Sequence, residues 1–123
     1  MRSIAIAVGG ALGAVLRFWL STTVSALTGG QFPYGTLAVN VTGSGFMGLL
    51  YVLLYERMEG STELRAALLI GVLGAFTTFS TFSIETMALL EEGQHLKAGL
   101  NVLASVLLCL IVCWIGIILG RQL

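Results

Sequence analysis

Residues 71–85 read GVLGAFTTFSTFSIE, and this stretch decides how the chain is interpreted. Five hydroxyl residues and three phenylalanines interleave within the eight positions 76–83. Thr, Ser and Phe are mediocre helix formers and Gly is a poor one, so a helix through positions 74–78 can unwind at modest cost. What such an unwound segment implies depends on the environment of the chain.

The composition of the chain is that of a membrane protein. Of its 123 residues, 57% are hydrophobic and only 10% are charged, whereas a soluble domain carries about 25% charged residues. Six Lys and Arg balance six acidic residues, so the chain lacks the positive charge that neutralises phosphates, and nucleic-acid binding is excluded. Sixteen glycines and a mean hydropathy of +0.99 are typical of closely packed helices inside a bilayer.

Charged residues separate four apolar runs, at about 4–26, 35–55, 66–90 and 98–120. Each run reaches the length of about 20 residues that a transmembrane helix requires. The first run is also too long for the apolar core of a signal peptide. We therefore expect an all-α membrane protein in which residues 1–123 form a single four-helix transmembrane domain.

The connections between the runs are short, including 56–65 and 91–97, so consecutive helices are predicted to be antiparallel neighbours. If both termini lie on one side, the positive residues divide four against two. The four are Arg2, Arg57, Arg65 and Arg121, and the two are Lys97 and an outward-reaching Arg17. This bias weakly favours termini in the cytoplasm, and so small a difference could leave the direction of insertion undecided.

Inside a membrane, an unwound segment around Gly74–Thr78 would be suited to binding an ion. Broken helices at membrane depth are tolerated only where they face protein or a watery cavity, and their freed backbone groups can hold ions. The sequence therefore predicts a broken third helix with an ion site. The alternative is a kinked but continuous packing helix, whose Ser and Thr side chains bond to the carbonyl groups four residues earlier.

Other polar residues lie within the apolar runs, where they are costly and informative. Asn40, followed one turn later by Ser44, could replace the water around an anion with amide hydrogens, or could simply join two helices. The last run carries a four-residue repeat that indicates either a polar track or a packing seam. Its members are Asn101, Ser105, Cys109 and Cys113.

Two pairs of glycines have the spacing that lets two helix backbones approach closely. They are Gly9 with Gly13, and Gly116 with Gly120.

Two ionisable residues lie deepest in the runs, and each would cost about 2.5 to 3.5 kcal/mol at the bilayer centre. Arg17 could snorkel outward past Trp19 or line a vestibule. Glu85 requires either a water-filled mouth or a polar partner such as Thr81.

The residues do not favour an enzyme. His95, the single histidine, falls in the polar 91–97 turn, so Ser44 lacks a base that could activate it. Cys109 and Cys113 are interpreted as small packing residues, because two thiols without a nearby His or carboxylate make a poor metal site.

Three blocks of sequence resemble the Fluc/CrcB-type fluoride ion channels, small four-helix proteins of microbial membranes. The blocks are GGALGAVLR at 9–17, GTLAVN at 35–40, and Gly74 with TTFSTFS at 77–83. The resemblance covers essentially the whole chain. It implies a dual-topology, antiparallel homodimer in the lipid of the cell (inner) membrane, with two pores that export fluoride passively. Such a channel lowers cytoplasmic fluoride and confers fluoride resistance.

The resemblance also implies a role for particular residues. Asn40, Phe79 and Phe82 match residues of the fluoride pathway, and Arg17 matches an arginine near the pore mouth. Backbone carbonyls of Gly74 and Thr77 match a structural sodium site at the dimer centre. The polar track of the last helix matches Asn101, Ser105 and Cys109, although the thiol of Cys109 is a weaker donor than a hydroxyl.

The chemistry of fluoride fits these residue types. Fluoride holds water so tightly that a pore must offer strong donors instead, which Asn40, Ser80 and Thr81 can supply. Phe79 and Phe82 can present the positive edges of their rings to an anion.

The alternative function is a small proton-coupled multidrug or cation transporter that uses Glu85. A third possibility is a subunit that only scaffolds a larger complex.

Overall fold

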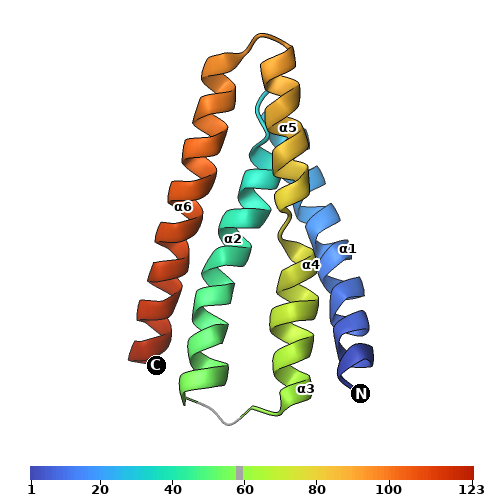
Figure 1. Ribbon diagram of the computed structural model, residues 1–123, viewed down its shortest axis with the longest axis vertical. Helices are drawn as coiled ribbons and strands as arrows, with labels where there is room; N and C mark the ends of the chain where they lie inside the picture. Colours follow the sequence, from blue (N-terminus) through green and yellow to red (C-terminus); the bar gives the residue numbers. More distant parts are fainter. Residues whose placement is uncertain (58–59) are drawn as a thin grey trace.

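The computed structural model describes residues 1–57 and 60–123, and the described residues form a bundle of four long helical segments (Figure 1). Residues 58–59, within the predicted 56–65 connection, lie outside the described residues. The segments run from Arg2 to Thr28, Tyr34 to Arg57, Thr62 to Glu91 and His95 to Gln122, and all four are long and apolar enough to cross a membrane. The structure thus contains the four long apolar helices that the sequence predicts, each a candidate membrane span.

The second and third segments each contain more than one helical element. The second is α2 (Tyr34–Tyr51) followed by the π-helix η1 (Val52–Arg57), whereas α1 (Arg2–Thr28) and α6 (His95–Gln122) are continuous. The third consists of α3, η2, α4 and α5, which span Thr62–Arg65, Ala66–Leu73, Gly74–Phe76 and Phe79–Glu91.

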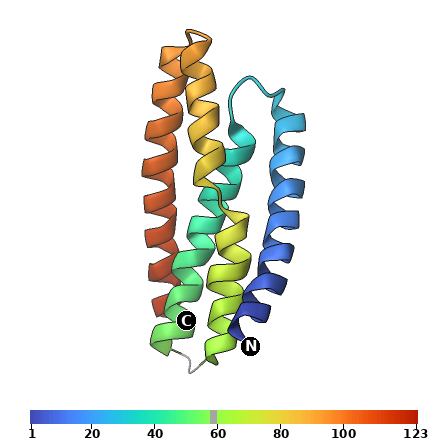
Figure 2. The same ribbon diagram turned by 45° about the vertical axis from the view of Figure 1, so that its right-hand side comes forward.

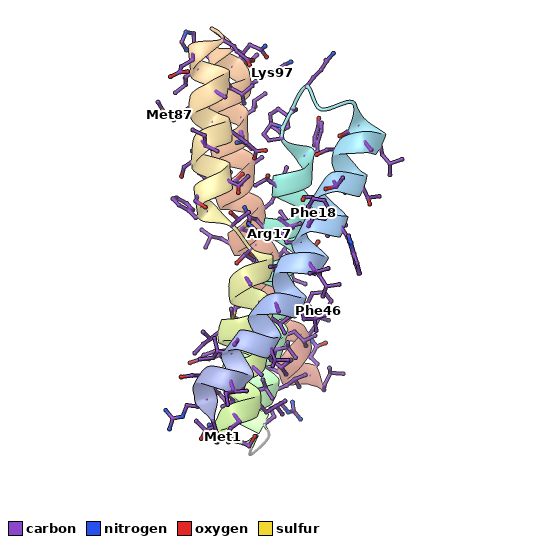
Figure 3. The ribbon with its side chains drawn as sticks, turned by 90° about the vertical axis from the view of Figure 1, so that its right-hand side faces the viewer. Met1, Arg17, Phe18, Phe46, Met87 and Lys97 are labelled. Carbon is purple, nitrogen blue, oxygen red and sulfur yellow. The ribbon has the colours of Figure 1, made fainter. Side chains whose placement is uncertain are left out.

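The turns place both termini at the same end of the bundle (Figure 1). Gly29 ends α1 with φ 83°, a left-handed conformation that favours glycine, and Gly93 has φ 78° in the turn between α5 and α6. With the ends so placed, Arg2 and Arg121 share one end of the molecule, and Lys97 lies near the other (Figure 3).

The third segment is interrupted between α4 and α5, as Figure 2 shows about halfway along it. Thr77 has φ −88° and ψ 157°, and Thr78 has φ −151° and ψ 110°, so both residues are extended. The predicted break is present. The hydroxyl-to-carbonyl bonds of the continuous-helix alternative occur as well, on either side of the break: Thr77 Oγ1 donates to Leu73 O, and Ser83 Oγ donates to Phe79 O.

Glycines allow the segments to pack at short distance. A Cβ atom on Gly9 or Gly13 would overlap the backbone of η2, at Ala67 and Val72 respectively. On the other side of the bundle, a Cβ atom on Gly116 of α6 would overlap the backbone O of Gly45 in α2. Close approach at both glycine motifs is thus confirmed.

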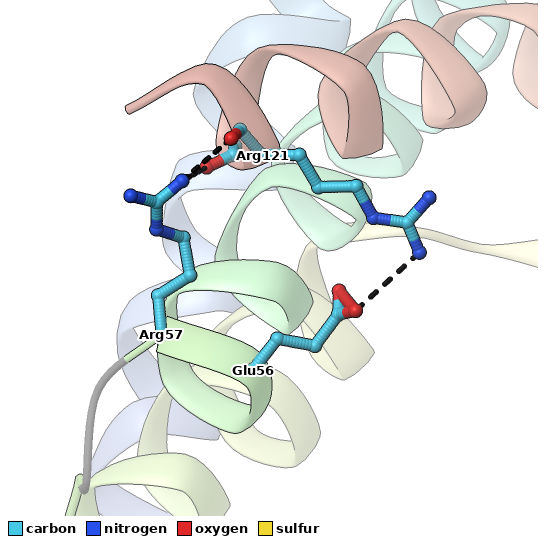
Figure 4. A network of polar contacts seen from close by, with 4 residues as sticks. Glu56, Arg57 and Arg121 are labelled. Carbon is cyan, nitrogen blue, oxygen red and sulfur yellow. Dashed lines mark hydrogen bonds and ion pairs between the residues drawn. The ribbon is translucent and has the colours of Figure 1, made fainter.

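A polar cluster joins the ends of η1 and α6 (Figure 4). Arg57 Nη1 donates to the carbonyl oxygens of Arg121 at 2.5 Å and Gly120 at 3.4 Å, which satisfies carbonyls that the end of α6 leaves free. Arg121 pairs with Glu56 at 3.4 Å. Both of these side chains are substantially exposed, so this ion pair adds little stability, and the arginine-to-carbonyl bonds are the stronger link.

The close packing of α2 and α6 leads to a direct test. Gly116→Ala is expected to destabilise the protein by about 1–3 kcal/mol, because the added methyl group overlaps the backbone of α2. Gly99→Ala in the same helix is the matched control, because its Cβ atom meets nothing within 4 Å. This control should stabilise the protein by about 0.5–1 kcal/mol through helix propensity. Thermal unfolding in detergent, followed by circular dichroism, measures both changes, and equal midpoints for the two variants would contradict this account.

Candidate ion pathway

The side chain of Asn40 holds the break in place. Its Nδ2 donates to Thr78 O at 3.0 Å, and its Oδ1 accepts from Thr78 N at 2.7 Å. In a continuous helix, the N–H and C=O of Thr78 would bond to backbone groups four residues before and after it. Here the side-chain amide of Asn40 provides a partner for both groups. Because an amide nitrogen carries two hydrogens, one N–H of Asn40 remains for another acceptor. Both roles expected for Asn40, joining helices and donating to an anion, are compatible with this geometry.

Further contacts support the break from both sides. Thr78 Oγ1 accepts from Thr81 N at 3.2 Å, which caps the start of α5, and donates to Thr81 Oγ1 at 2.9 Å. A Cβ atom on Gly43 would overlap Cγ2 of Thr77, so glycine at this position makes room for the unwound segment. The sequence analysis did not identify Gly43 as a site residue. Its position one turn after Asn40, on the same side of α2, could have indicated that it lies near the break.

The break also leaves carbonyl oxygens without helical partners. In a continuous helix, the carbonyl of Gly74 would accept from Thr78 N, but Thr78 N here donates to Asn40. Likewise, the carbonyl of Thr77 would accept from Thr81 N, but Thr81 N here donates to Thr78 Oγ1. Carbonyl oxygens are suitable ligands for a hard cation such as sodium. The backbone at the two predicted positions therefore fits a sodium site.

A cavity of about 440 Å³ opens beside the break, between α2, α5 and α6. Its lining brings together most of the residues predicted for an anion pathway. They are Asn40, Phe79, Phe82, Ser105 and Cys109, accompanied by Ser44, Thr77, Thr78 and Cys113. The rings of Phe79 and Phe82 lie side by side, with centroids 5.2 Å apart and planes inclined by 45°.

Only part of the predicted polar track on α6 lines this cavity. Ser105 Oγ donates to Asn101 Oδ1 at 3.4 Å, which links the first two members of the track. Asn101 is 2% exposed, and its Nδ2 donates to Thr86 Oγ1 of α5 at 2.9 Å. Asn101 thus joins α5 to α6, whereas Ser105 and Cys109 face the cavity. Thr86, the partner of Asn101, was not among the predicted residues.

A smaller cavity of about 140 Å³ lies on the other side of Thr78. It is lined by Arg17 and Ser21 of α1, Thr36 of α2, and Thr78 and Thr81. Arg17 lies eleven residues before the end of α1 at Thr28, near mid-height in Figure 3. Because Arg17 lines this cavity, the vestibule alternative is compatible with the structure, and the role of Arg17 stays a prediction.

Ser80 and Glu85 stand apart from both cavities. Ser80 is exposed, and its hydroxyl lies 3.4 Å from Thr78 Oγ1. The Oε1 atom of Glu85 is buried and has no hydrogen-bond partner among the described residues, so Thr81 does not serve as the partner expected for it.

Together, four membrane-length helices and a polar interruption beside two cavities are typical of α-helical membrane proteins that handle ions. Comparison with known proteins identifies the family. Residues 4–117 match the family described as CrcB-like protein, Camphor Resistance (CrcB). The chain belongs to this family, which confirms the resemblance found in the sequence.

Three relatives are each named fluoride-specific ion channel FluC. The protein from Methylococcus capsulatus is 56% identical over 119 residues, which cover 97% of this chain and 52% of the relative, so the chain spans about half of that protein. The protein from Coxiella burnetii (strain Dugway 5J108-111) is 49% identical over 124 residues and is covered completely. The protein from Geobacter sulfurreducens is 55% identical over 120 residues, which cover 98% of this chain and 97% of the relative.

The role of Asn40 in the break is open to measurement. Asn40→Leu preserves size but leaves both backbone groups of Thr78 without partners, so we expect a loss of stability of about 1–3 kcal/mol. Ser44→Ala, one turn further along the same cavity, serves as the control and should change stability little. A thermal unfolding midpoint for Asn40→Leu that matches the control would rule out this role.

Proposed function

We propose that this chain is a passive, fluoride-selective channel of the cell membrane that exports fluoride and lowers its cytoplasmic concentration. Residues 1–123 act as one four-helix transmembrane domain. The observation that carries the proposal is the likeness, at 49% and 55% identity over nearly full length, to relatives named fluoride-specific ion channel FluC. These relatives favour the channel over the proton-coupled transporter that Glu85 would serve.

The donors around the break suit a strongly hydrated anion. One N–H of Asn40 is free to donate, and the hydroxyls of Ser105 and Thr81 lie on the two cavities that flank Thr78. Cys109 extends the pathway as its weakest donor, and Ser80, which is exposed outside both cavities of the single chain, would join the pathway only in the assembled protein. Ser105 has a single O–H, which it donates to Asn101 Oδ1 in this structure, so it donates to an anion only when the hydroxyl rotates away from Asn101. Donors spread along a path in this way allow an ion to bind and to leave.

Arg17 supplies positive potential at the mouth of the pathway. Arg17 lines the cavity that contains Thr78 and Thr81, so its side chain brings a permanent positive charge to that region. An anion is attracted by this charge before it reaches the uncharged donors.

The two phenylalanines can solvate an anion without holding it firmly. Aromatic rings carry partial positive charge at their edges, and the tilted arrangement of Phe79 and Phe82 leaves ring edges available. Phe82 is 9% exposed, whereas Phe79 is 77% exposed within the single chain. So exposed an aromatic beside polar donors suits a pathway that a second subunit completes.

We propose that the second subunit is an antiparallel copy of this chain, so that each of two pores uses residues of both subunits. Gly74 supports a close approach, because it is exposed at the break and a Cβ atom there would meet nothing nearer than 3.7 Å in its own chain. With the two breaks face to face, carbonyls of Gly74 and Thr77 from both subunits would surround one sodium ion. The remaining exposed apolar side chains would face membrane lipid.

The fluoride pathway is tested with purified protein in liposomes. The unmodified protein should release fluoride rapidly and chloride hardly at all. Phe79→Ile and Phe82→Ile should slow fluoride release by about ten-fold or more, equivalent to about 1.4 kcal/mol in the barrier. Phe46→Ile is the matched control, because Phe46 is exposed on α2 and lines neither cavity beside the break. Equal fluoride and chloride release by the unmodified protein would refute the proposal.

Dual topology is tested by altering the charge at each end of the bundle. Two Lys added after Leu123 should bias insertion toward termini inside and lower fluoride transport, since fewer antiparallel pairs can form. Glu91→Lys with Glu92→Lys, in the exposed turn at the opposite end, should bias insertion the other way. Co-expression of the two variants should restore transport. Undiminished transport in membranes where reporter fusions place every C-terminus on one side would exclude the antiparallel pair.

A further inference from the structure

A third and larger cavity lies away from the break, between the α1–α2 connection and the first half of α6. Its volume is about 740 Å³. Gln31 and Tyr34 line it from the connection and the start of α2, and Lys97 lines it from the first turn of α6. Leu100, Leu103 and Leu107 continue the lining along α6. Neither the fluoride pathway nor the sodium site uses these residues.

The lining changes from polar to apolar along α6. Lys97 lies at the end of the bundle where α6 begins, beyond the apolar run 98–120 (Figure 3). The ten helical steps from Lys97 to Leu107 extend about 15 Å along the helix axis. This is about the depth of one leaflet, half of the ~30 Å hydrocarbon core. The cavity therefore has a cationic end at the membrane surface and an apolar end near the midplane.

This cavity also faces away from the ion pathway. Successive residues of a helix are rotated by about 100°, so the centre of the stripe Ser105, Cys109 and Cys113 lies about 160° around α6 from the centre of the stripe that lines this cavity. The two cavities thus lie on opposite faces of α6. A molecule in the larger cavity therefore contacts a different face of α6 from the residues of the ion pathway.

We propose that this groove binds one anionic glycerophospholipid per chain. An acyl chain lies along Leu100, Leu103 and Leu107, and the phosphate lies against the ammonium group of Lys97. Lys97 is the cation among the lining residues that the structure describes, and these residues include no carboxylate to oppose a phosphate. An anionic headgroup is preferred because it brings no ammonium group of its own to compete with Lys97.

Native mass spectrometry of the detergent-purified full-length chain, with phosphatidylglycerol or phosphatidylcholine added at equal concentration, tests this site. We expect one phosphatidylglycerol retained per chain, about five-fold more readily than phosphatidylcholine, as one lysine near the membrane surface predicts. Lys97→Gln should reduce retention of phosphatidylglycerol to the level of phosphatidylcholine. Ala104→Phe, which fills the groove, should reduce retention of both lipids.

Two controls separate the groove from general effects. Arg2→Gln removes a positive charge at the other end of the bundle, and Leu119→Phe adds an aromatic ring at an exposed position near the far end of α6, so neither should change lipid retention. Equal retention of the two lipids by the unmodified protein, or an unchanged preference in Lys97→Gln, would overturn the assignment. If Ala104→Phe instead lowers the oligomeric mass while lipid retention stays constant, the groove is a contact between copies of the chain and the proposal is wrong.

Discussion

The paired hydrogen bonds between the side-chain amide of Asn40 and the backbone of Thr78 are the contact on which the rest of this structure depends. An unwound segment at membrane depth leaves backbone groups without partners, and each such group costs several kcal/mol where water is absent. Asn40 satisfies both the N–H and the C=O of Thr78 from a different helix. The third segment can therefore be interrupted without leaving these two groups bare.

The same contact supports the proposal that the break serves ions of both signs. Once Thr78 bonds to Asn40 and its hydroxyl caps α5, carbonyl groups on the α4 side lose their helical partners and become available to a cation. On the other side, the spare N–H of Asn40 and nearby hydroxyls are available to an anion. Acceptors and donors thus arise from one local rearrangement of backbone, within a chain that has few charged residues. Gly43 contributes by leaving room for Thr77.

Most of the fold could be predicted from the sequence, because apolar length and short connections determine a four-helix membrane bundle. The break was also predictable, since the residues around 74–78 disfavour a helix. The precise role of Asn40 was not, because its partner lies 38 residues away and helical periodicity carries no information about contacts at that separation. The four-residue spacing likewise placed Asn101 in a polar stripe, but did not predict that its amide donates to Thr86 on the neighbouring helix. Arg17 was already predicted to lie deep in the first run, but its neighbours in the cavity, Thr36, Thr78 and Thr81, come from other helices and could not be predicted from periodicity.

Solid-state NMR on the protein in lipid, with asparagine and threonine isotopically labelled, tests the central claim most directly. The account predicts a through-space contact between the side-chain amide nitrogen of Asn40 and the carbonyl carbon of Thr78. It also predicts that the Asn40 amide resonance shifts when fluoride is added and stays fixed when chloride is added. Absence of the Asn40 to Thr78 contact, or an equal response to the two halides, would contradict it.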